Sequence, residues 1–278
     1  MSSSMNRLLS LLLLTWVVLI PACHPLPEQY TKLEPRIVDA VSGQSILIQV
    51  DYGEVTIMGF DDTNVAVDGQ VLFKDELEYS IDTADEQILI KALSNQNSSN
   101  VPLRLVIRVP HQTQVKVETK NASVIAHDLQ GDLVVDSIAG DITIERMTGR
   151  ATLHSNRGKI TVRKSSGIFS VVGNYGLLTL QDVSGEIAAS TIMGDIAIGG
   201  LIQMGDSVRL ETDHGAVFVN LKKDSTLSIQ VRSTSGDVTC MLPGLTSTTR
   251  TCDGDLNAVG GSLSIRTVSG AVVLQLIP

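Results

Sequence analysis

From Gly131 to Ile198 the sequence reads GDLVVDSIA GDITIERMT GRATLHSNR GKITVRKSS GIFSVVGNY GLLTLQDVS GEIAASTIM GDIAI, so a nine-residue unit begins with glycine eight times in succession. Apolar residues recur two and four positions after each glycine: Leu133 and Val135, Ile142 and Ile144, Ala151 and Leu153, Ile160 and Val162, Phe169 and Val171, Leu178 and Leu180, Ile187 and Ala189, Ile196 and Ile198. Alternation with a period of two after a glycine turn is typical of a strand with one buried side. The uninterrupted repeat predicts a β-solenoid, in which each unit covers its apolar side by stacking on the next.

The length of one coil follows from the charged residues between the apolar positions. With coils of 18 residues, each acid faces a base or a histidine on the neighbouring coil: Asp132 and Arg150, Asp136 and His154, Asp141 and Lys159, Glu145 and Arg163. With coils of nine residues, like charges meet, as in Asp132 with Asp141. Opposite charges in register stabilise neighbouring strands, and like charges destabilise them. We therefore predict an all-β solenoid (β-helix) with two strands in each coil of 18 residues.

The rest of the chain also alternates apolar and polar residues and shows no sustained helical period. Residues 37–112 are expected to form an N-terminal β cap region that continues into the solenoid domain, residues 113–278. After Gly194 the glycine spacing becomes irregular, and the strand-like residues 272–277 are expected to cap the stack. Asn156 and Asn174 lie 18 residues apart, so they either stack as an amide ladder or are two exposed turn residues.

The N-terminus has the pattern of an export signal. Residues 1–22 combine Arg7 with an apolar run that is short for a membrane-spanning helix. The following Ile20-Pro21-Ala22-Cys23 resembles the lipobox of bacterial lipoproteins, although Pro21 departs from the usual residue. The resemblance implies that Cys23 carries lipid and anchors an exported protein on the extracytoplasmic side of the cell membrane or outer membrane. Residues 23–36, with three prolines, are expected to be a tether.

The cysteines and the net charge indicate which compartment the protein occupies and which partners it can bind. With Cys23 lipidated, Cys240 and Cys252 remain in an oxidising compartment, where they either form a disulfide or stay as a buried and a free thiol. The net charge is −9, and removal of residues 1–22, which contain one base, makes it −10. An acidic surface argues against nucleic acid as a partner. We expect the protein to attach to the membrane through the lipid on Cys23.

The solenoid units also carry a family pattern. The motif Ser/Thr-x-Gly-Asp-Ile/Val-x-Ile/Val is clearest at residues 139–144, 193–198 and 235–239, after Arg108-Val109-Pro110 and Val115-Lys116-Val117. With these motifs, residues 40–278 resemble the bacterial putative-adhesin family of β-solenoid domains. The resemblance implies an exported or membrane-attached protein and supplies no catalytic residues.

Other chemistries fit the repeat poorly. Arg150, Lys159 and Ile168 each follow a repeat glycine and cannot bind calcium, so we predict no calcium ladder, no other metal site and no cofactor. Enzymes that cleave polysaccharides on a β-helix need clustered carboxylates, which the stacked positions do not provide. A polysaccharide-active enzyme therefore stays as the less favoured alternative, because the loops could still hold a catalytic site.

One outward group of aliphatic side chains is a candidate contact surface. The register places Val134, Ile168 and Val172 on the same outward side of the solenoid, and grouped exposed aliphatic residues often mark contact sites. The sequence thus predicts a noncatalytic, membrane-anchored envelope lipoprotein that binds an envelope protein or a glycan as an adhesin. The alternative is a structural or envelope-stress accessory protein that packs against other envelope components.

Overall fold

The computed structural model describes residues 30–40, 44–84, 86–95, 100–258 and 260–278. The signal segment and Cys23 lie outside the described residues. The described chain is nearly all β, with a single turn of 3₁₀ helix, η1 (Lys74–Glu76). The strands are β1 (Thr31–Lys32), β2 (Arg36–Asp39), β3 (Ser45–Phe60), β4 (Asn64–Val71), β5 (Leu77–Thr83), β6 (Gln87–Ser94), β7 (Leu103–Pro110), β8 (Gln114–His127), β9 (Asp132–Ser137), β10 (Ile142–Glu145), β11 (Thr148–Ser155), β12 (Ile160–Gly173), β13 (Leu178–Thr191), β14 (Ile196–Gly200), β15 (Ser207–Thr212), β16 (Val217–Lys222), β17 (Leu227–Ser233), β18 (Val238–Met241), β19 (Thr246–Ser247), β20 (Thr251–Leu256), β21 (Gly261–Thr267) and β22 (Val272–Ile277).

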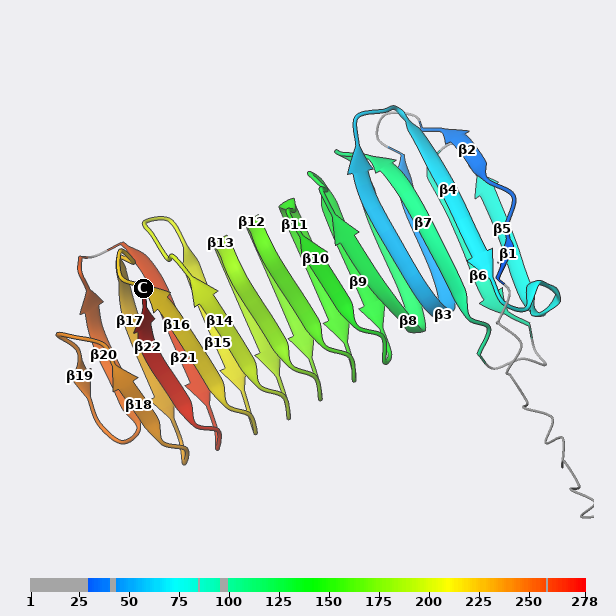
Figure 1. Cartoon of the computed structure of the whole chain (residues 1–278). Helices are drawn as coiled ribbons and strands as arrows, with labels where there is room; N and C mark the ends of the chain where they lie inside the picture. The colour runs from blue at the N-terminus through cyan, green and yellow to red at the C-terminus, as the bar shows by residue number, and fades with distance from the viewer. Residues whose placement is uncertain (1–29, 41–43, 85, 96–99, 259) are drawn as a thin grey trace, which may run out of the picture.

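The centre of the molecule is the predicted solenoid, a rod of parallel rungs with two walls (Figure 1). Ile142 pairs with Ile160, and Ile160 pairs with Leu178, so each strand lies beside the residues 18 positions further on. We call the wall that contains β9 and β11 wall A, and the wall that contains β10 wall B. All sixteen apolar residues predicted from the repeat are buried between the walls. The 18-residue coil is therefore confirmed.

The turn from wall A to wall B, here called the hydroxyl corner, is built around buried Ser and Thr side chains. Their hydroxyl oxygens accept a hydrogen bond from the backbone N–H three residues further on, in the pairs Thr119 with Ala122, Ser137 with Gly140, Ser155 with Gly158, Thr191 with Gly194 and Thr267 with Gly270. The backbone also passes close to the rung below, since a Cβ at Gly158 would lie 2.0 Å from the Gly140 carbonyl oxygen. A Cβ at Gly167, in the other half of the pattern, would lie 1.9 Å from the Gly149 carbonyl oxygen, so the glycines reflect close rung-to-rung contact at both turns.

The opposite turn, from wall B back to wall A, uses left-handed backbone. Asp128, Arg146, Lys164 and Asp182 have φ of 61°, 54°, 48° and 52° and stack in one column. The Arg146 guanidinium donates to both carboxylate oxygens of Asp128, at 2.8 and 2.9 Å. Side chains at this turn therefore pair between rungs while their backbones adopt a conformation that favours glycine or asparagine.

The C-terminal strands do not cap the stack, contrary to the sequence expectation. β21 pairs with β15 on one side and with β17 on the other, and β22 likewise lies between β16 and β18. The terminal rung is instead β17 with β18, and β20 covers the outer edge of β17 in antiparallel orientation. Irregular glycine spacing after Gly194 thus reflects a change in strand order as well as longer loops.

The N-terminal end has the same interleaved arrangement. β3 lies between β8 and the rung formed by β6 and β7, although β6 and β7 come later in the chain than β3. Antiparallel strands β5 and β4 then cover the outer edges of β6 and β7. β1 and β2 pair with β4, so the described part of the expected tether, from Thr31 onward, is attached to the fold rather than free.

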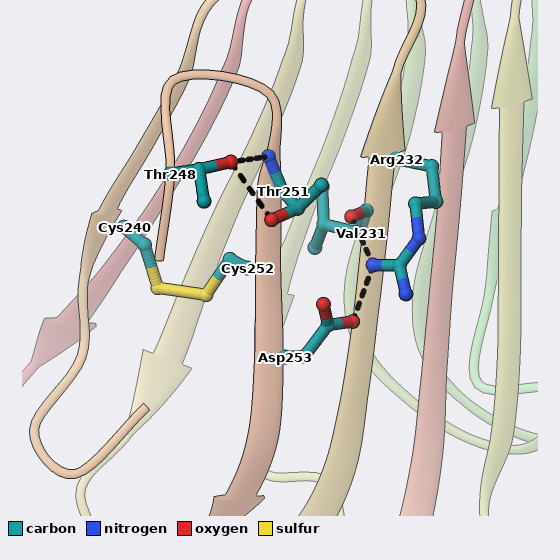
Figure 2. Close-up of a disulfide and its surroundings, with 7 residues drawn as sticks. All are labelled: Val231, Arg232, Cys240, Thr248, Thr251, Cys252 and Asp253. Carbon is teal, nitrogen blue, oxygen red and sulfur yellow. Dashed lines mark hydrogen bonds and ion pairs between the residues drawn. A yellow bond between two sulfur atoms is a disulfide. The ribbon is translucent and has the colours of Figure 1, made fainter. Parts of the chain in front are cut away.

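A disulfide joins Cys240 to Cys252 at the C-terminal end of the rod (Figure 2). Cys240 belongs to β18 in wall B, and Cys252 in β20 lies opposite Val231 of wall A. Cys252 is fully buried in the core cluster, and Cys240 packs against that cluster. The bond therefore links the two walls where no further rung covers the apolar interior.

Candidate functional site

A groove runs along wall A beside the hydroxyl corner, and we call it the corner groove. Its larger hollow has a volume of about 660 Å³ and crosses β6, β3, β8, β9 and β11 to reach Asn174 in the turn after β12. A second hollow of about 310 Å³ starts from the same Asn174 and continues over β13 and β15 to β21. Asn174 lines both hollows, so the two hollows adjoin at this residue and follow the same corner of the rod.

The N-terminal part of the groove carries paired charges. Lys120 Nζ lies 3.0 Å from Asp51 Oδ1, and Lys116 Nζ lies 2.7 Å from Glu118 Oε1. Hydrogen bonds from Lys116 and then from Gln49 lower the pKa of Glu118 below its usual range. The Glu118 carboxylate is therefore held ionised beside Lys116, and Asp51 also has a lysine partner, which leaves this part of the groove polar.

The centre of the groove holds an amide pair. Asn174 Nδ2 donates to Asn156 Oδ1 at 2.8 Å, so the ladder is formed and the alternative of two independent exposed asparagines is wrong. The bond leaves the Asn156 amide group as a donor and the Asn174 oxygen as an acceptor. His154 and Asp136 lie next to this pair on adjacent rungs, with His154 Nδ1 3.9 Å from Asp136 Oδ1.

Exposed apolar side chains follow the same corner. Ile138 and Ile192 occupy the positions equivalent to the two asparagines on flanking rungs and are 54% and 47% exposed. Tyr175 follows Asn174 and is 59% exposed, with Met193 in the equivalent position on the next rung. The corner thus combines an amide pair, a free aromatic face and aliphatic neighbours, which is a combination that can bind a ligand with both apolar and hydroxyl surfaces.

The candidate contact residues Val134, Ile168 and Val172 lie on one outward face, that of wall A. Ile168 and Val172 belong to β12 and are 42% and 37% exposed, with Ser170 between them. Val134 lies on β9, and the strand β11 separates it from β12. Val172 also lines the second hollow of the groove. The three residues therefore share a wall without forming one continuous patch.

Sequence reasoning offered the amide ladder as one of two alternatives and missed the groove around it. The Ser/Thr-x-x-Gly spacing of the hydroxyl corner was visible in the sequence, for example at Ser137 and Ser155. The acidic part of the groove was not, because Asp51 reaches it only through the position of β3 beside β8. In the described residues no group of three or more His, Cys, Asp or Glu side chains is arranged to hold a metal ion.

The fold and the groove define a β-solenoid with an elongated surface site. The chain belongs to the family described as Toastrack DUF4097, whose model matches residues 43–275. A structure of a putative adhesin from Bacteroides fragilis is similar, with a TM-score of 0.54 and 12% identity, and the match covers 89% of this chain and 99% of that one. A putative adhesin from Parabacteroides distasonis gives a TM-score of 0.48 and 12% identity, covering 89% of this chain and 98% of that one.

At such identities the likeness concerns the fold. No curated protein matches the sequence. Across the residues that the structure describes, no helix combines the length and apolar character needed to cross a membrane.

Proposed function

We propose that this protein is an adhesin-like binding module that holds an extended ligand in the corner groove. The observation that carries the proposal is that two hollows on successive rungs adjoin at Asn174 along one corner of the rod. Parallel rungs repeat every ~4.8 Å and hold their outward side chains at fixed spacing. A site of this kind is preformed, so little ordering is required when a linear ligand binds.

Two further features support a binding role over a catalytic one. The carboxylates at the N-terminal part of the groove are paired with lysines, whereas general acid–base catalysis needs a carboxyl group whose proton affinity suits proton transfer. The similar structure from Bacteroides fragilis supports the same role, since that protein is described as a putative adhesin.

A charge placed in the groove tests the proposal. Replacing Ile138, which is 54% exposed, with Glu should abolish binding of the mature protein to polymers of its own envelope, measured by surface-based binding assays. The matched control is Phe218→Glu, because Phe218 is 42% exposed on β16 of wall B. Equal binding by both variants, or equal loss in both, would contradict a groove site.

Anchoring through lipid at Cys23 completes the proposed function. It rests on the lipobox-like residues 20–23, which precede the described chain. A Cys23→Ser variant should appear in the soluble fraction after cell lysis, and the parent protein should partition into detergent. Metabolic labelling with a palmitate analogue should mark the parent alone. Labelling of the variant would contradict lipidation at this residue.

A role as an envelope accessory protein is the second candidate, favoured by the exposed pair Ile168 and Val172 on β12. In that role wall A packs against another envelope component. Replacing both residues with Ser should then abolish co-purification with that component, while Ile37→Ser, at the 74% exposed Ile37 of β2, should not. Unchanged co-purification and sedimentation would remove this candidate.

A further inference from the structure

The centre of the corner groove has a repeat that selects among linear polymers. Outward groups recur once per rung, at ~4.8 Å. An extended peptide presents one side chain to the same face every two residues, at about 6.7 Å, so it loses register within two rungs. An extended chain of β-1,4-linked pyranose rings advances by roughly one strand spacing for each ring. A polysaccharide can therefore place one ring on each rung.

The amide pair offers the hydrogen bonds that a sugar ring needs. Because Asn174 Nδ2 already binds Asn156 Oδ1, the outer ends of the pair are one donor and one acceptor on adjacent rungs. Neighbouring hydroxyl groups on a pyranose ring can each donate and accept. They can therefore satisfy both ends without breaking the bond between the two asparagines.

An exposed tyrosine belongs to the same turn, with its backbone N–H bonded to the Asn156 carbonyl oxygen at 3.1 Å. Tyr175 directly follows Asn174, is 59% exposed and makes no side-chain hydrogen bond within the described chain. Pyranose rings have an apolar face of C–H groups, which packs against an aromatic ring while the hydroxyl edges stay polar. Met193 on the next rung extends the apolar surface, and it is 55% exposed.

The charges of the groove favour an uncharged chain. Asp51 and Glu118 are already paired with Lys120 and Lys116. Asp136 Oδ1 lies 3.9 Å from His154 Nδ1, and Asp136 is directly opposite Glu118 on the neighbouring strand. The carboxylates at this end of the groove would repel a polyanion. Because Asp51 and Glu118 already have lysine partners, they would attract a polycation only weakly.

We propose that the corner groove binds an uncharged polysaccharide of 1,4-linked pyranoses, with the Asn156–Asn174 pair and Tyr175 as the central subsite. This inference rests on the proposed function and names its ligand class. Binding should strengthen with chain length as successive rings occupy successive rungs.

The test uses the mature protein with three defined probes, the β-1,4-linked hexasaccharides of glucose, N-acetylglucosamine and mannose, in isothermal titration calorimetry. At least one should bind, and its disaccharide should bind at least about tenfold more weakly. The double variant Asn156→Ile with Asn174→Ile should lose at least about tenfold in affinity, as expected when two hydrogen bonds are removed. The change should preserve the fold, because Ile138 and Ile192 already occupy these positions on flanking rungs.

A second variant and its control test the aromatic face. Tyr175→Ala should weaken binding of the hexasaccharide at least about fivefold, while Phe218→Ala, which removes another exposed aromatic side chain from wall B, should leave it unchanged. Loss of affinity in both would overturn the assignment of this subsite.

Failure of this inference is distinguishable from failure of the proposed function. If none of the hexasaccharides binds, but envelope polymers bind in a manner that depends on Ile138, the sugar assignment is overturned and the groove remains a binding site. If an extended peptide binds more tightly than every hexasaccharide, the sugar assignment is likewise overturned and the groove remains a binding site. If Ile138→Glu has no effect on any ligand, both proposals fall.

Discussion

Single hydroxyl groups at the hydroxyl corner hold each rung to its neighbour. The buried Ser155 oxygen accepts from the Gly158 N–H at 2.9 Å and donates to the Gly140 carbonyl of the preceding rung at 3.1 Å. Ser155→Ala should lower the free energy of unfolding by about 1–3 kcal/mol, because it leaves a buried N–H unsatisfied. Urea unfolding measures this. Ser170→Ala, on the outward side of β12, is the control and should have little effect.

At the turn from wall B back to wall A, the Asp128 carboxylate makes the stability of the fold depend on pH. Hydrogen bonds from Arg146 and then His127 lower the pKa of Asp128 well below its usual range. A lowered pKa in the folded state stabilises the fold above the unfolded pKa of ~3.9, and this contribution disappears as the pH falls below that value. Asp128→Asn should therefore lower stability slightly at pH 6, with the difference shrinking below about pH 4.

The measurement is urea unfolding of both proteins across that pH range. Asn suits the positive φ of Asp128, 61°, so the substitution tests the charge rather than the backbone. The effect is expected to be small, because the Asp128 side chain is 36% exposed and exposed ion pairs are screened by solvent. A difference that stays constant from pH 6 to pH 3 would show that the ionised carboxylate is not its cause.

Among the elements, the terminal hairpin depends on its disulfide. Cys240 and Cys252 are 12 residues apart, and their bond fastens β20 over the end of the rod. A Cys240→Ser, Cys252→Ser double variant should lose roughly 2–3 kcal/mol, the value expected for a cross-linked loop of this size. Hydrogen exchange should show the loss of protection concentrated in β17 and β20. Uniform loss along the rod would contradict a local role for the bond.

The regular elements were predictable from the sequence, and the order of the irregular ones was not. Between Gly131 and Ile198 the repeat supplied strand positions, coil length and core, since each rung contacts only its neighbours in the chain. The same alternation in β21 and β22 predicted that these segments are strands, but it did not predict which strands they pair with. Both edges of β17 can pair with a strand that has the same apolar–polar alternation. The local pattern therefore does not show whether β21 caps the stack or inserts into it.

On the scale of the whole molecule, both ends of the rod join strands that are distant in the chain. Leu274 of β22 is fully buried although it lies four residues before the last residue, Pro278. Leu274→Asp should therefore be severely destabilising, by more than about 4 kcal/mol, because it places an unpaired charge between two rungs. Circular dichroism and solubility report the loss. Gln275→Asp, at the exposed next position, should be tolerated.

The groove, in contrast, belongs to no single element. Its larger hollow is lined by β3, β6, β8, β9, β11 and the turn after β12, and its second hollow by β12, β13, β15 and β21. These strands lie along one rod (Figure 1). The Asn156–Asn174 pair was predictable because both residues lie within the repeat. The position of Asp51 beside Lys120 required the strand order of the N-terminal end.

The insertion of β21 and β22 between earlier rungs governs the order in which the chain can be assembled during synthesis. A chain emerging from its N-terminus cannot lay down one rung after another to completion, because residues 227–241 must leave a vacant layer for residues 261–277. Until those residues arrive, unpaired strand edges of two rungs face water, which is a state prone to aggregation. Closure of this seam has to wait for residues 261–277, and a chaperone that shields open strand edges would have its greatest effect before they arrive.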